Sequence, residues 1–179
     1  MTKYILIREI DWNNLSQLNR CDNSFLVEHQ WRLYTRDDDI CYTLSPARQF
    51  TKSYPPEELE YASYIDNPEK TIFFAYINEQ LAGQIILRKN WNGYAYIEDI
   101  AVDSRFRRQG VGRRLMDRAV EWAKSKLLPG MMLETSSVNV TACQFYQSFG
   151  FKLGGFDRFL YRAMLPGTEE VAMYWYLIF

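Results

Sequence analysis

The segment YIEDIAVDSRFRRQGVGRRLM, from Tyr96 to Met116, decides the fold of this chain. Its first part, up to Val102, is rich in β-forming residues and predicts a strand. A short loop follows, and Gly110 and Gly112 then open a helix whose apolar residues recur at helical spacing. A strand, a loop and a glycine-rich helix start in direct succession indicate a place where the backbone can approach a ligand closely.

The start of this helix suits an anionic group. The first backbone N–H groups of a helix have no partner within it and together carry about half a positive charge. Five arginines lie within about one turn of the glycines and add fixed positive charge: Arg105, Arg107, Arg108, Arg113 and Arg114. The segment therefore predicts a cradle for a phosphate or pyrophosphate. Taken alone, it fits a glycine-containing loop beside a solvated basic helix equally well.

Two common phosphate-binding motifs do not match this segment. A Walker A loop needs Lys followed by Ser or Thr after its second glycine, whereas Gly112 is followed by Arg113 and Arg114. The dinucleotide fingerprint needs a third glycine, and only Gly110-Val111-Gly112 is present.

The residues before the segment predict an antiparallel meander. Thr71–Ile77, Leu81–Leu87 and Tyr94–Val102 each read as a strand, and the turns Asn78-Glu79 and Asn92-Gly93 join them. Further upstream, Tyr4–Ile10 predicts a first strand, and a short helix is expected around Leu15 and Leu18. A second helix is expected to begin at Pro55-Pro56-Glu57-Glu58-Leu59-Glu60 and to stop at Asn67-Pro68.

Residues 20–54 are harder to interpret. Phe25–Tyr34 and Ile40–Leu44 fit two strands around the acidic turn Asp37-Asp38-Asp39, but their pattern leaves other structures open.

The residues after the segment alternate helix and strand. The helix that starts near Val111 is expected to run to about Leu127, where Pro129-Gly130 ends it. A buried strand is expected over Met131–Thr135. A helix follows, capped by Asn139 and terminated by Gly150. Two final strands are expected over Phe151–Tyr161 and Val171–Phe179. A meander followed by these elements predicts an α/β (α+β) fold with a mixed sheet, as a single domain over residues 1–179.

Composition narrows the class of protein. A chain of 179 residues with 47% hydrophobic residues, 5 Trp, 13 Tyr and 11 Phe can fill a core, so disorder over most of its length is not expected. Its 21 basic and 22 acidic side chains give a net charge of −1, which argues against a protein that wraps nucleic acid.

Cys21, Cys41 and Cys143 form no CxxC pair, so neither a zinc site nor a disulfide scaffold is expected. The apolar run before Arg8 and Glu9 is too short for a signal or a membrane span, and a cytoplasmic protein is expected.

Two motifs resemble those of the GNAT superfamily of acetyl-CoA-dependent N-acetyltransferases. Arg107–Gly112 (RRQGVG) resembles its Q/R-x-x-G-x-G/A pattern, and Ile100–Asp103 resembles the end of its fourth strand. Asn139–Phe151 (NVTACQFYQSFGF) resembles its second motif, and the resemblance covers roughly residues 70 to 160. A closer likeness, to the streptothricin acetyltransferases of this superfamily, rests on Tyr96–Val102, Glu121–Lys124, Met132–Thr135 and Trp175–Phe179.

The resemblance implies a fold and a cosubstrate. The GNAT fold is a mixed, mostly antiparallel sheet flanked by helices and splayed between its fourth and fifth strands. The cosubstrate would be acetyl-CoA, with no metal, and the acceptor would be a cationic small-molecule amine; in the streptothricin enzymes this amine belongs to the β-lysine moiety. A homodimer is left open, and neither nucleic acid nor a membrane is an expected partner.

The resemblance also implies site residues. The pantetheine arm would pair with the fourth strand, and the pyrophosphate would lie on the loop and helix start, so the expected cofactor-binding residues are Ile100, Ala101, Val102, Arg107, Arg108, Gln109, Gly110, Val111, Gly112, Arg113, Asn139 and Tyr146. The alternative for Asn139 is a plain helix N-cap. Tyr146 is the expected general acid that protonates the departing thiolate, and the alternative is simple packing with Phe145 and Phe149.

The amine must also lose a proton before it can attack. A lysine-type ammonium has a pKa of about 10.4, so at pH 7 the neutral form is disfavoured by about 4.6 kcal/mol. Glu98 is the expected base or cation-recognition group, since regular alternation would put it on one face with Tyr96 and Ile100. Asp99 would then point the other way, unless a bulge exchanges the two. An ordinary surface carboxylate is the alternative for Glu98.

A polycationic substrate should meet acidic side chains on its other side. Asp157, Glu28 and the turn Asp37-Asp38-Asp39 are the candidates, although each could be a solvated charge. The aromatic residues Trp31, Tyr34, Tyr174 and Trp175 could pack on a cation or sugar, or belong to the core. The single histidine, His29, is given no catalytic or metal-binding role, and Cys143 is expected to be a helix-face thiol rather than a nucleophile.

Three other functions stay open from the sequence. The same fold could acetylate an aminoglycoside, a polyamine or a protein amine. The chain could be a non-catalytic regulator that binds acetyl-CoA. The arginine cluster from Arg105 to Arg114 could serve a nucleic-acid-binding module, although the net charge argues against it.

Overall fold

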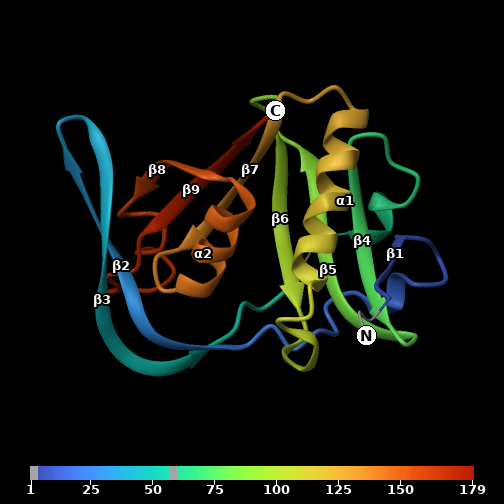
Figure 1. The fold of residues 1–179 in the computed structure, drawn as a ribbon, viewed down its shortest axis with the longest axis horizontal. Coiled ribbons are helices and arrows are strands. Elements are labelled where there is room, and N and C mark those ends of the chain that lie inside the picture. The colour runs from blue at the N-terminus through green and yellow to red at the C-terminus, as the bar shows by residue number, and fades with distance from the viewer. Residues whose placement is uncertain (1–3, 57–59) are drawn as a thin grey trace. The chain divides into compact units, whose positions relative to one another are not determined.

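The computed structural model describes residues 4–56 and 60–179. The chain forms two compact units, which we describe one at a time. The first unit contains Met1–Ser24 and Ser53–Met131, and the second contains Phe25–Lys52 and Met132–Phe179. Figure 1 follows the chain through both units. The expected single domain over residues 1–179 and the expected splay between the fourth and fifth strands concern the arrangement of the units and remain predictions.

The first unit is built on an antiparallel sheet. Its strand order is β1 (Leu6–Glu9), β4 (Lys70–Ile77), β5 (Gln80–Lys89) and β6 (Ala95–Val102). The predicted first strand and the predicted meander are therefore confirmed. Asn78 and Glu79 both have positive φ, 48° and 65°, as the tight hairpin turn between β4 and β5 requires.

One face of this sheet is covered by α1 (Val111–Ser125), which contacts β4, β5 and β6 (Figure 1). The apolar stripe of the helix supplies the buried residues Val111, Leu115, Met116, Ala119, Trp122 and Ala123. The predicted helix is confirmed, although it ends at Ser125, shortly before the expected Leu127. Leu127 has a φ of 55°, which helical backbone does not allow.

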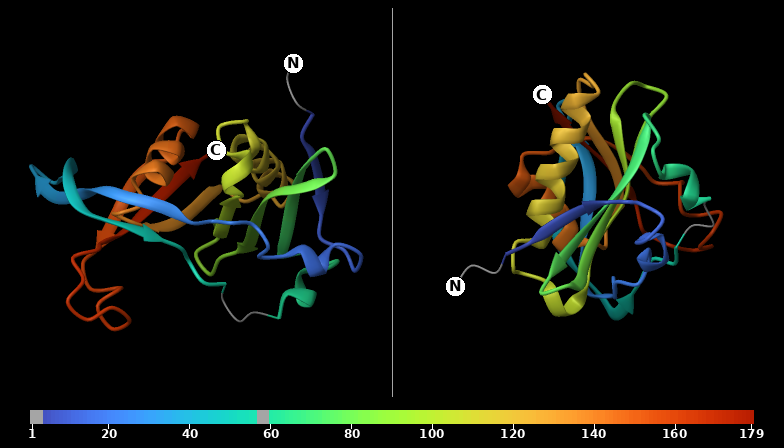
Figure 2. Two further views of the ribbon diagram at one scale, coloured as in Figure 1. Left: turned by 90° about the horizontal axis from the view of Figure 1, so that it is seen from below. Right: turned by 90° about the vertical axis from the view of Figure 1, so that its right-hand side faces the viewer.

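The opposite face carries short 3-10 helices, as Figure 2 shows. These are η1 (Leu15–Gln17) and η2 (Tyr61–Tyr64). These helices and this face of the sheet pack around a buried cluster, which consists of Ile10, Tyr64, Ile72, Phe74, Tyr76 and Ile86. A third short helix, η3 (Ser104–Phe106), follows β6.

The prediction of a helix between Pro55 and Asn67-Pro68 is wrong for the described residues of this stretch, where only η2 forms. Residues 57–59, which belong to the predicted helix, lie outside the described residues. Local polar side chains take up the backbone groups that a longer helix would need. Ser63 Oγ donates to the carbonyl of Glu60, and Asn67 Nδ2 donates to the carbonyl of Ser63. Asp66, with a φ of 53°, then turns the chain out of helical conformation. The short helix expected around Leu15 is likewise only a 3-10 turn.

The second unit combines three strands, one helix and a long hairpin. The strand order is β7 (Gly130–Ser136), β9 (Ala172–Ile178) and β8 (Lys152–Asp157), with β8 and β9 antiparallel. Between β7 and β8 the chain forms α2 (Val140–Phe149). Both predicted ends of α2 are confirmed, because Asn139 Oδ1 accepts from the N–H of Ala142 and Gly150 has a φ of 113°.

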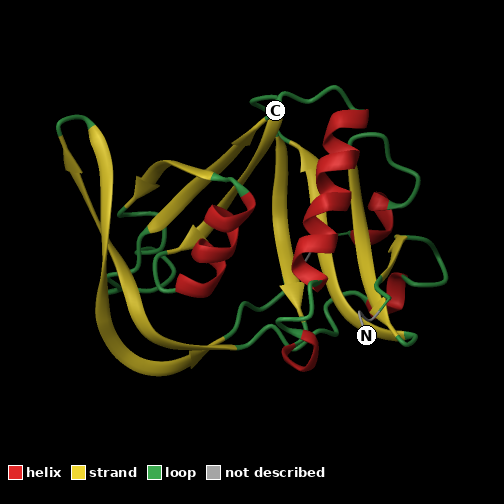
Figure 3. Ribbon diagram, viewed as in Figure 1, coloured by secondary structure: helices red, strands yellow, loops and turns green. Residues whose placement is uncertain are grey.

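The hairpin accounts for most of residues 20–54. It pairs β2 (Phe25–Arg36) with β3 (Asp39–Lys52), both drawn as long strands in Figure 3. The two expected strands are confirmed and are longer than expected. Asp37 and Asp38, with φ of 50° and 66°, form the turn. The strand expected over Phe151–Tyr161 stops at Asp157, because Asp157 Oδ1 accepts from the N–H groups of Phe159 and Leu160 and starts a turn.

Gly83 allows α1 to pack closely on β5. A Cβ atom at this position would lie 2.8 Å from the carbonyl oxygen of Ala101 and 3.0 Å from side-chain atoms of both Leu115 and Val111. The position therefore has no room for a side chain, because a backbone oxygen cannot move aside as a flexible side chain can.

We expect Gly83→Ala to destabilise the fold by about 1–3 kcal/mol, the usual cost of overpacking. In thermal unfolding this corresponds to a loss of about 2–4 °C for each kcal/mol. Gly155→Ala is the matched control, since its Cβ would have its nearest neighbour, a ring atom of Tyr174, at 4.0 Å. Equal midpoints for the two variants would contradict the close approach.

Candidate functional site

The loop after β6 is organised by one buried carboxylate. Asp103, only 3% exposed, accepts hydrogen bonds from the N–H of Arg105 and from its Nε, at 3.1 and 2.9 Å. Its second oxygen accepts from the N–H of Asp22 at 3.2 Å. The Arg105 guanidinium holds the pKa of Asp103 below its usual value, so this carboxylate stays charged. These hydrogen bonds hold the loop together from its buried side.

The helix that follows begins without a side-chain cap. Gly110 is the N-cap residue of α1, with φ 86° and ψ 0°, and it has no side chain that could accept from the first N–H groups. The first turn of the helix carries no acidic residue. Gly110, Arg108 and Arg113 are exposed around this end. The predicted geometry for an anion at a helix start is thus present, and it fits a pyrophosphate.

Two of the expected phosphate-binding side chains have structural partners. Arg107 donates from Nε to the carbonyl of Val102 at 3.2 Å, and from a terminal nitrogen to the carbonyl of Asp22 at 3.3 Å. Gln109 donates to the carbonyl of Arg105 at 3.1 Å. These side chains brace the loop, so their part in binding would come through backbone N–H groups.

A β-bulge changes the expected direction of two carboxylates on β6. Asp99 pairs with Ile86, whereas Ile97 pairs with Leu87, so Glu98 is the extra residue in the strand. Glu98 and Asp99 consequently contact residues on the same face, whereas regular alternation would separate them. Glu98 binds Tyr64, and Asp99 accepts from Gln84 at 2.7 Å.

Because of the bulge, Glu98 lies on the same face of the sheet as Tyr96 but not as Ile100. Arg88 pairs with Glu98 and lies over the Tyr96 ring, so those two residues share a face as expected. Ile100 pairs with Ile85 and, by alternation after Asp99, lies on the other face of the sheet. The expectation that Glu98 and Ile100 share a face is therefore wrong.

Both oxygens of Glu98 are engaged. Arg88 Nε donates to Oε1 at 2.8 Å, and the Tyr64 hydroxyl donates to Oε2 at 2.5 Å. The Glu98 side chain is 14% exposed. Burial and the neighbouring carboxylate of Glu98 raise the pKa of Tyr64, so its hydroxyl remains a donor at all ordinary pH values. Glu98 is therefore an ion-paired carboxylate with a hydrogen-bond partner on each oxygen.

In the second unit, Tyr146 lies on the buried side of α2. It is 6% exposed, and its ring centroid lies 5.7 Å from that of Phe145, 5.9 Å from Phe151 and 6.5 Å from Trp175. The packing alternative is thus present, and it also orients the ring rigidly. A general-acid role for Tyr146 and a cofactor contact for Asn139 remain predictions.

Cys143 is fully buried on the same helix, and burial raises the pKa of its thiol to about 12. A thiol in this state is no nucleophile at neutral pH, in agreement with the interpretation from the sequence.

The expected substrate-binding residues differ in their surroundings. Asp157 caps the turn after β8 with one oxygen. Glu28 is exposed beside the bulge of β2 and accepts from Gln49 at 3.2 Å. The acidic turn forms the exposed tip of the hairpin, where Asp37 lies 3.8 Å from Arg36. Trp175 is buried in the core, and Trp31 packs edge-on against Tyr42.

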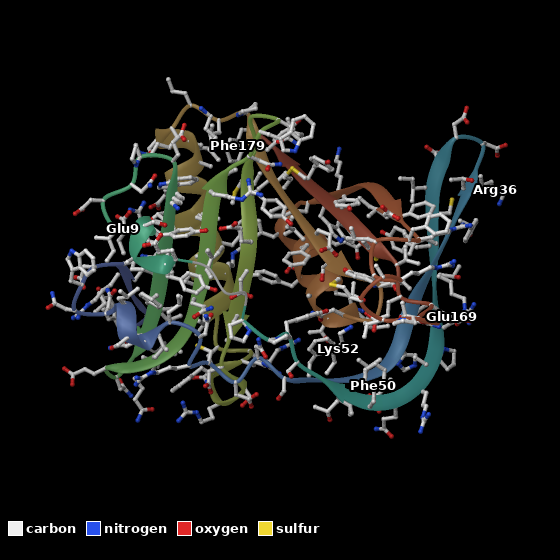
Figure 4. The ribbon with its side chains drawn as sticks, turned by 180° about the vertical axis from the view of Figure 1, so that it is seen from behind. Glu9, Arg36, Phe50, Lys52, Glu169 and Phe179 are labelled. Atoms are coloured by element: carbon white, nitrogen blue, oxygen red, sulfur yellow. The ribbon has the colours of Figure 1, made fainter. Side chains whose placement is uncertain are left out.

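Sequence reasoning missed Glu134. This residue is the charged member of the mostly buried strand β7, and the Tyr161 hydroxyl donates to its Oε1. Burial raises the pKa of Glu134, while the Tyr161 hydrogen bond and the charge of Lys52 oppose that rise. Lys52, labelled in Figure 4 near the end of β3, pairs with Glu170, which also accepts from Ser136 at 2.6 Å. A lone carboxylate in a buried strand is the signal that the sequence contained.

The described part of the chain contains neither a helix suited to cross a membrane nor a cluster suited to hold a metal ion. None of its helices combines the length and apolar character that a membrane span needs. Nor do residues 4–56 and 60–179 contain a group of three or more His, Cys, Asp or Glu side chains placed to hold a metal ion.

Comparisons with known proteins agree with this geometry. Residues 24–151 match the family model described as the acetyltransferase (GNAT) family. The chain is 40% identical over 177 residues to streptothricin acetyltransferase A of Bacillus subtilis, which covers 97% of this chain and 100% of the relative.

Two solved structures are also similar. One, a protein assigned as a streptothricin acetyltransferase from Bacillus anthracis in complex with acetyl coenzyme A, has a TM-score of 0.91 at 42% identity and covers 100% of this chain and 99% of that one. The other, a nourseothricin acetyltransferase, has a TM-score of 0.79 at 29% identity, with 97% and 98% coverage. The predicted mixed α/β fold is thereby confirmed as the GNAT fold. From the uncapped helix start, the two sequence motifs and these matches over the full length, we conclude that the chain belongs to the acetyltransferase (GNAT) family and is an acetyl-CoA-dependent N-acetyltransferase.

Proposed function

We propose that this enzyme acetylates an amine of streptothricin, on its β-lysine moiety, and so confers resistance to the antibiotic. The observation that carries the proposal is the 40% identity to the Bacillus subtilis streptothricin acetyltransferase over that protein's whole length. The match extends over 97% of this chain and so covers both units, not only the segment of the phosphate-binding motif. The same fold acting on another cationic amine is the alternative.

In this reaction we expect the residues of the chain to have the following roles. Acetyl-CoA supplies an activated acetyl group as a thioester. The backbone N–H groups after Gly110 bind its pyrophosphate, with Arg108 and Arg113 adding positive charge nearby. The backbone of Ile100–Val102 pairs with the pantetheine arm, and Asn139 contacts the same arm. The Tyr146 hydroxyl donates a proton to the sulfur as the amine displaces it.

We also expect a cytoplasmic location. Cys21, Cys41 and Cys143 all carry free thiols, which suits a reducing compartment. A homodimer remains open, and light scattering of the purified protein would measure its mass.

We expect Tyr146→Phe to lower kcat for nourseothricin by about 10²-fold or more, because removal of a general acid typically costs 10²–10⁴-fold. Coenzyme A release is measured with a thiol reagent, and acetyl-CoA affinity, measured by calorimetry, stays as in the wild type. Tyr94→Phe, a tyrosine beside the turn between β5 and β6, is the control.

The wild type tests the substrate itself. Release of coenzyme A with an aminoglycoside or polyamine but not with nourseothricin would contradict the streptothricin proposal. Acetyl-CoA binding without turnover of any amine would indicate a regulator instead.

We expect Gly110→Ala to weaken coenzyme A binding about tenfold in calorimetry. Alanine opposes the left-handed conformation by about 1 kcal/mol, and its methyl group narrows the approach to the first N–H groups. Gly167→Ala is the matched control, because Gly167 also has positive φ, 80°, with nothing near its Cβ position. Unchanged coenzyme A affinity in Gly110→Ala would contradict the role of this helix start.

A further inference from the structure

We propose that Glu134 receives the ammonium group of the substrate and takes its proton, with Tyr161 holding the carboxylate in place. This inference rests on the proposed function and adds the residue that prepares the amine for attack. It also moves the base from β6, where the sequence suggested Glu98, to β7 in the second unit.

The geometry leaves one oxygen of Glu134 available. Tyr161 donates to Oε1. Within the described residues, 4–56 and 60–179, Oε2 accepts no hydrogen bond and Glu134 forms no ion pair. A half-buried carboxylate with one oxygen fixed and the other open is suited to accept from an incoming N–H group.

The groups around Glu134 favour a cation. Burial raises the pKa of Tyr174 of β9, and the carboxylates of Glu134 and Asp157, both within electrostatic reach, raise it further. The cation that faces Glu134 is Lys52 of β3, and its charge is matched by Glu170. The carboxylates of Glu134 and Asp157 therefore leave an excess of negative charge, and the rings of Tyr161 and Tyr174 lie beside it. Carboxylates with aromatic neighbours are a common setting for an alkylammonium group.

The protonation behaviour of Glu134 suits a base. Burial raises its pKa, and the Tyr161 hydroxyl and the Lys52 charge act in the opposite direction. Each unit by which the pKa of the acceptor approaches that of the ammonium makes proton transfer tenfold more favourable. A carboxyl with a raised pKa is therefore a better proton acceptor than an exposed one, provided that the pH is high enough to keep it ionised.

Glu98 lacks these properties. Its two oxygens accept from Arg88 and Tyr64 at 2.8 and 2.5 Å, so its charge is already matched and each oxygen already has a partner. A carboxylate in this state attracts a second cation weakly, because the Arg88 guanidinium already balances its charge. Its role is to hold η2 against the sheet.

The proton and electron balance of the step is complete. Glu134 takes one proton from the ammonium, which leaves a lone pair on the nitrogen. The nitrogen forms a bond to the acetyl carbon while the carbon–sulfur bond breaks, and Tyr146 protonates the departing sulfur. The second nitrogen proton restores the Tyr146 hydroxyl through solvent, and Glu134 releases its proton to solvent. No other reactant is needed.

The first measurement uses the full chain without acetyl-CoA. Nourseothricin is titrated into wild type and Glu134→Gln at about pH 6 in two buffers of different ionisation enthalpy. We expect the wild type to release protons on binding, because the incoming cation favours ionised Glu134 over its protonated form. Glu134→Gln should bind about tenfold more weakly or worse, without this proton release. Glu169→Gln, an exposed carboxylate of the same unit (Figure 4), is the matched control and should behave as wild type.

The second measurement is the pH profile of kcat/KM. A base works only when ionised, so wild-type activity should fall as the pH drops through the raised pKa of Glu134. Glu134→Gln should lose at least about 10²-fold in kcat/KM at pH 7 and lose this acidic limb. Tyr161→Phe removes a hydrogen bond that lowers the pKa of Glu134, so its acidic limb should move to higher pH. This shift also tests the proposal if Glu134→Gln fails to fold.

The outcomes separate the two proposals. Wild-type turnover of nourseothricin with unchanged proton release in Glu134→Gln, or an unmoved acidic limb in Tyr161→Phe, would overturn the role of Glu134 and leave the proposed function standing. A wild type that neither binds nor acetylates nourseothricin would overturn both. Loss of proton release in Glu98→Gln with its retention in Glu134→Gln would return the role to β6.

Discussion

The N–H groups that begin α1 impose the main constraint on this molecule. Their N-cap residue is Gly110, which provides the left-handed turn into the helix but no oxygen to accept from them. An end of this kind is stable only if something else satisfies it, either water or an anion. The surrounding chain supports the second possibility, because Asp103 fixes the loop from within and the exposed arginines leave its outer side positive. The local backbone is therefore suited to an anionic partner.

A second constraint is the close packing of α1 on the sheet. Gly83 lets the helix lie so close to β5 that a methyl group would meet the Ala101 carbonyl. Ala101 belongs to β6, the strand whose end leads into the loop. Packing, strand and loop are consequently coupled, since a change in the distance between helix and sheet would also move the backbone that leads to Gly110. The first unit acts as a rigid support for one loop.

The two carboxylates Glu98 and Glu134 show how surroundings assign different roles to one residue type. Glu98 is brought onto an inner face by a β-bulge and meets a guanidinium and a phenol there. Glu134 meets a phenol but no cation in direct contact within the described residues, and burial raises its pKa. An ion-paired carboxylate stabilises structure, whereas a carboxylate that is desolvated and only partly satisfied is able to bind a cation or accept a proton.

The sequence alone was sufficient for the parts of the fold that depend on local rules. The tight turns at Asn78-Glu79 and Asn92-Gly93, the caps Asn139 and Gly150, and the apolar stripe of α1 were all predicted correctly, because turn conformation, capping and helical periodicity act over a few residues. The helix expected after Pro55 failed for the complementary reason. Its local signals were overruled by side-chain hydrogen bonds and by the burial of Tyr64 in a core drawn from distant segments.

Only the tertiary structure decided which groups surround each carboxylate. The bulge at Glu98 depends on the register between β5 and β6, and the partners of Glu98 and Glu134 come from residues far away along the chain. A sequence shows which residues can ionise, but their charge state depends on desolvation and on neighbours that folding brings together. The glycine-rich helix start was therefore readable from the sequence, whereas the chemistry of the carboxylates was not.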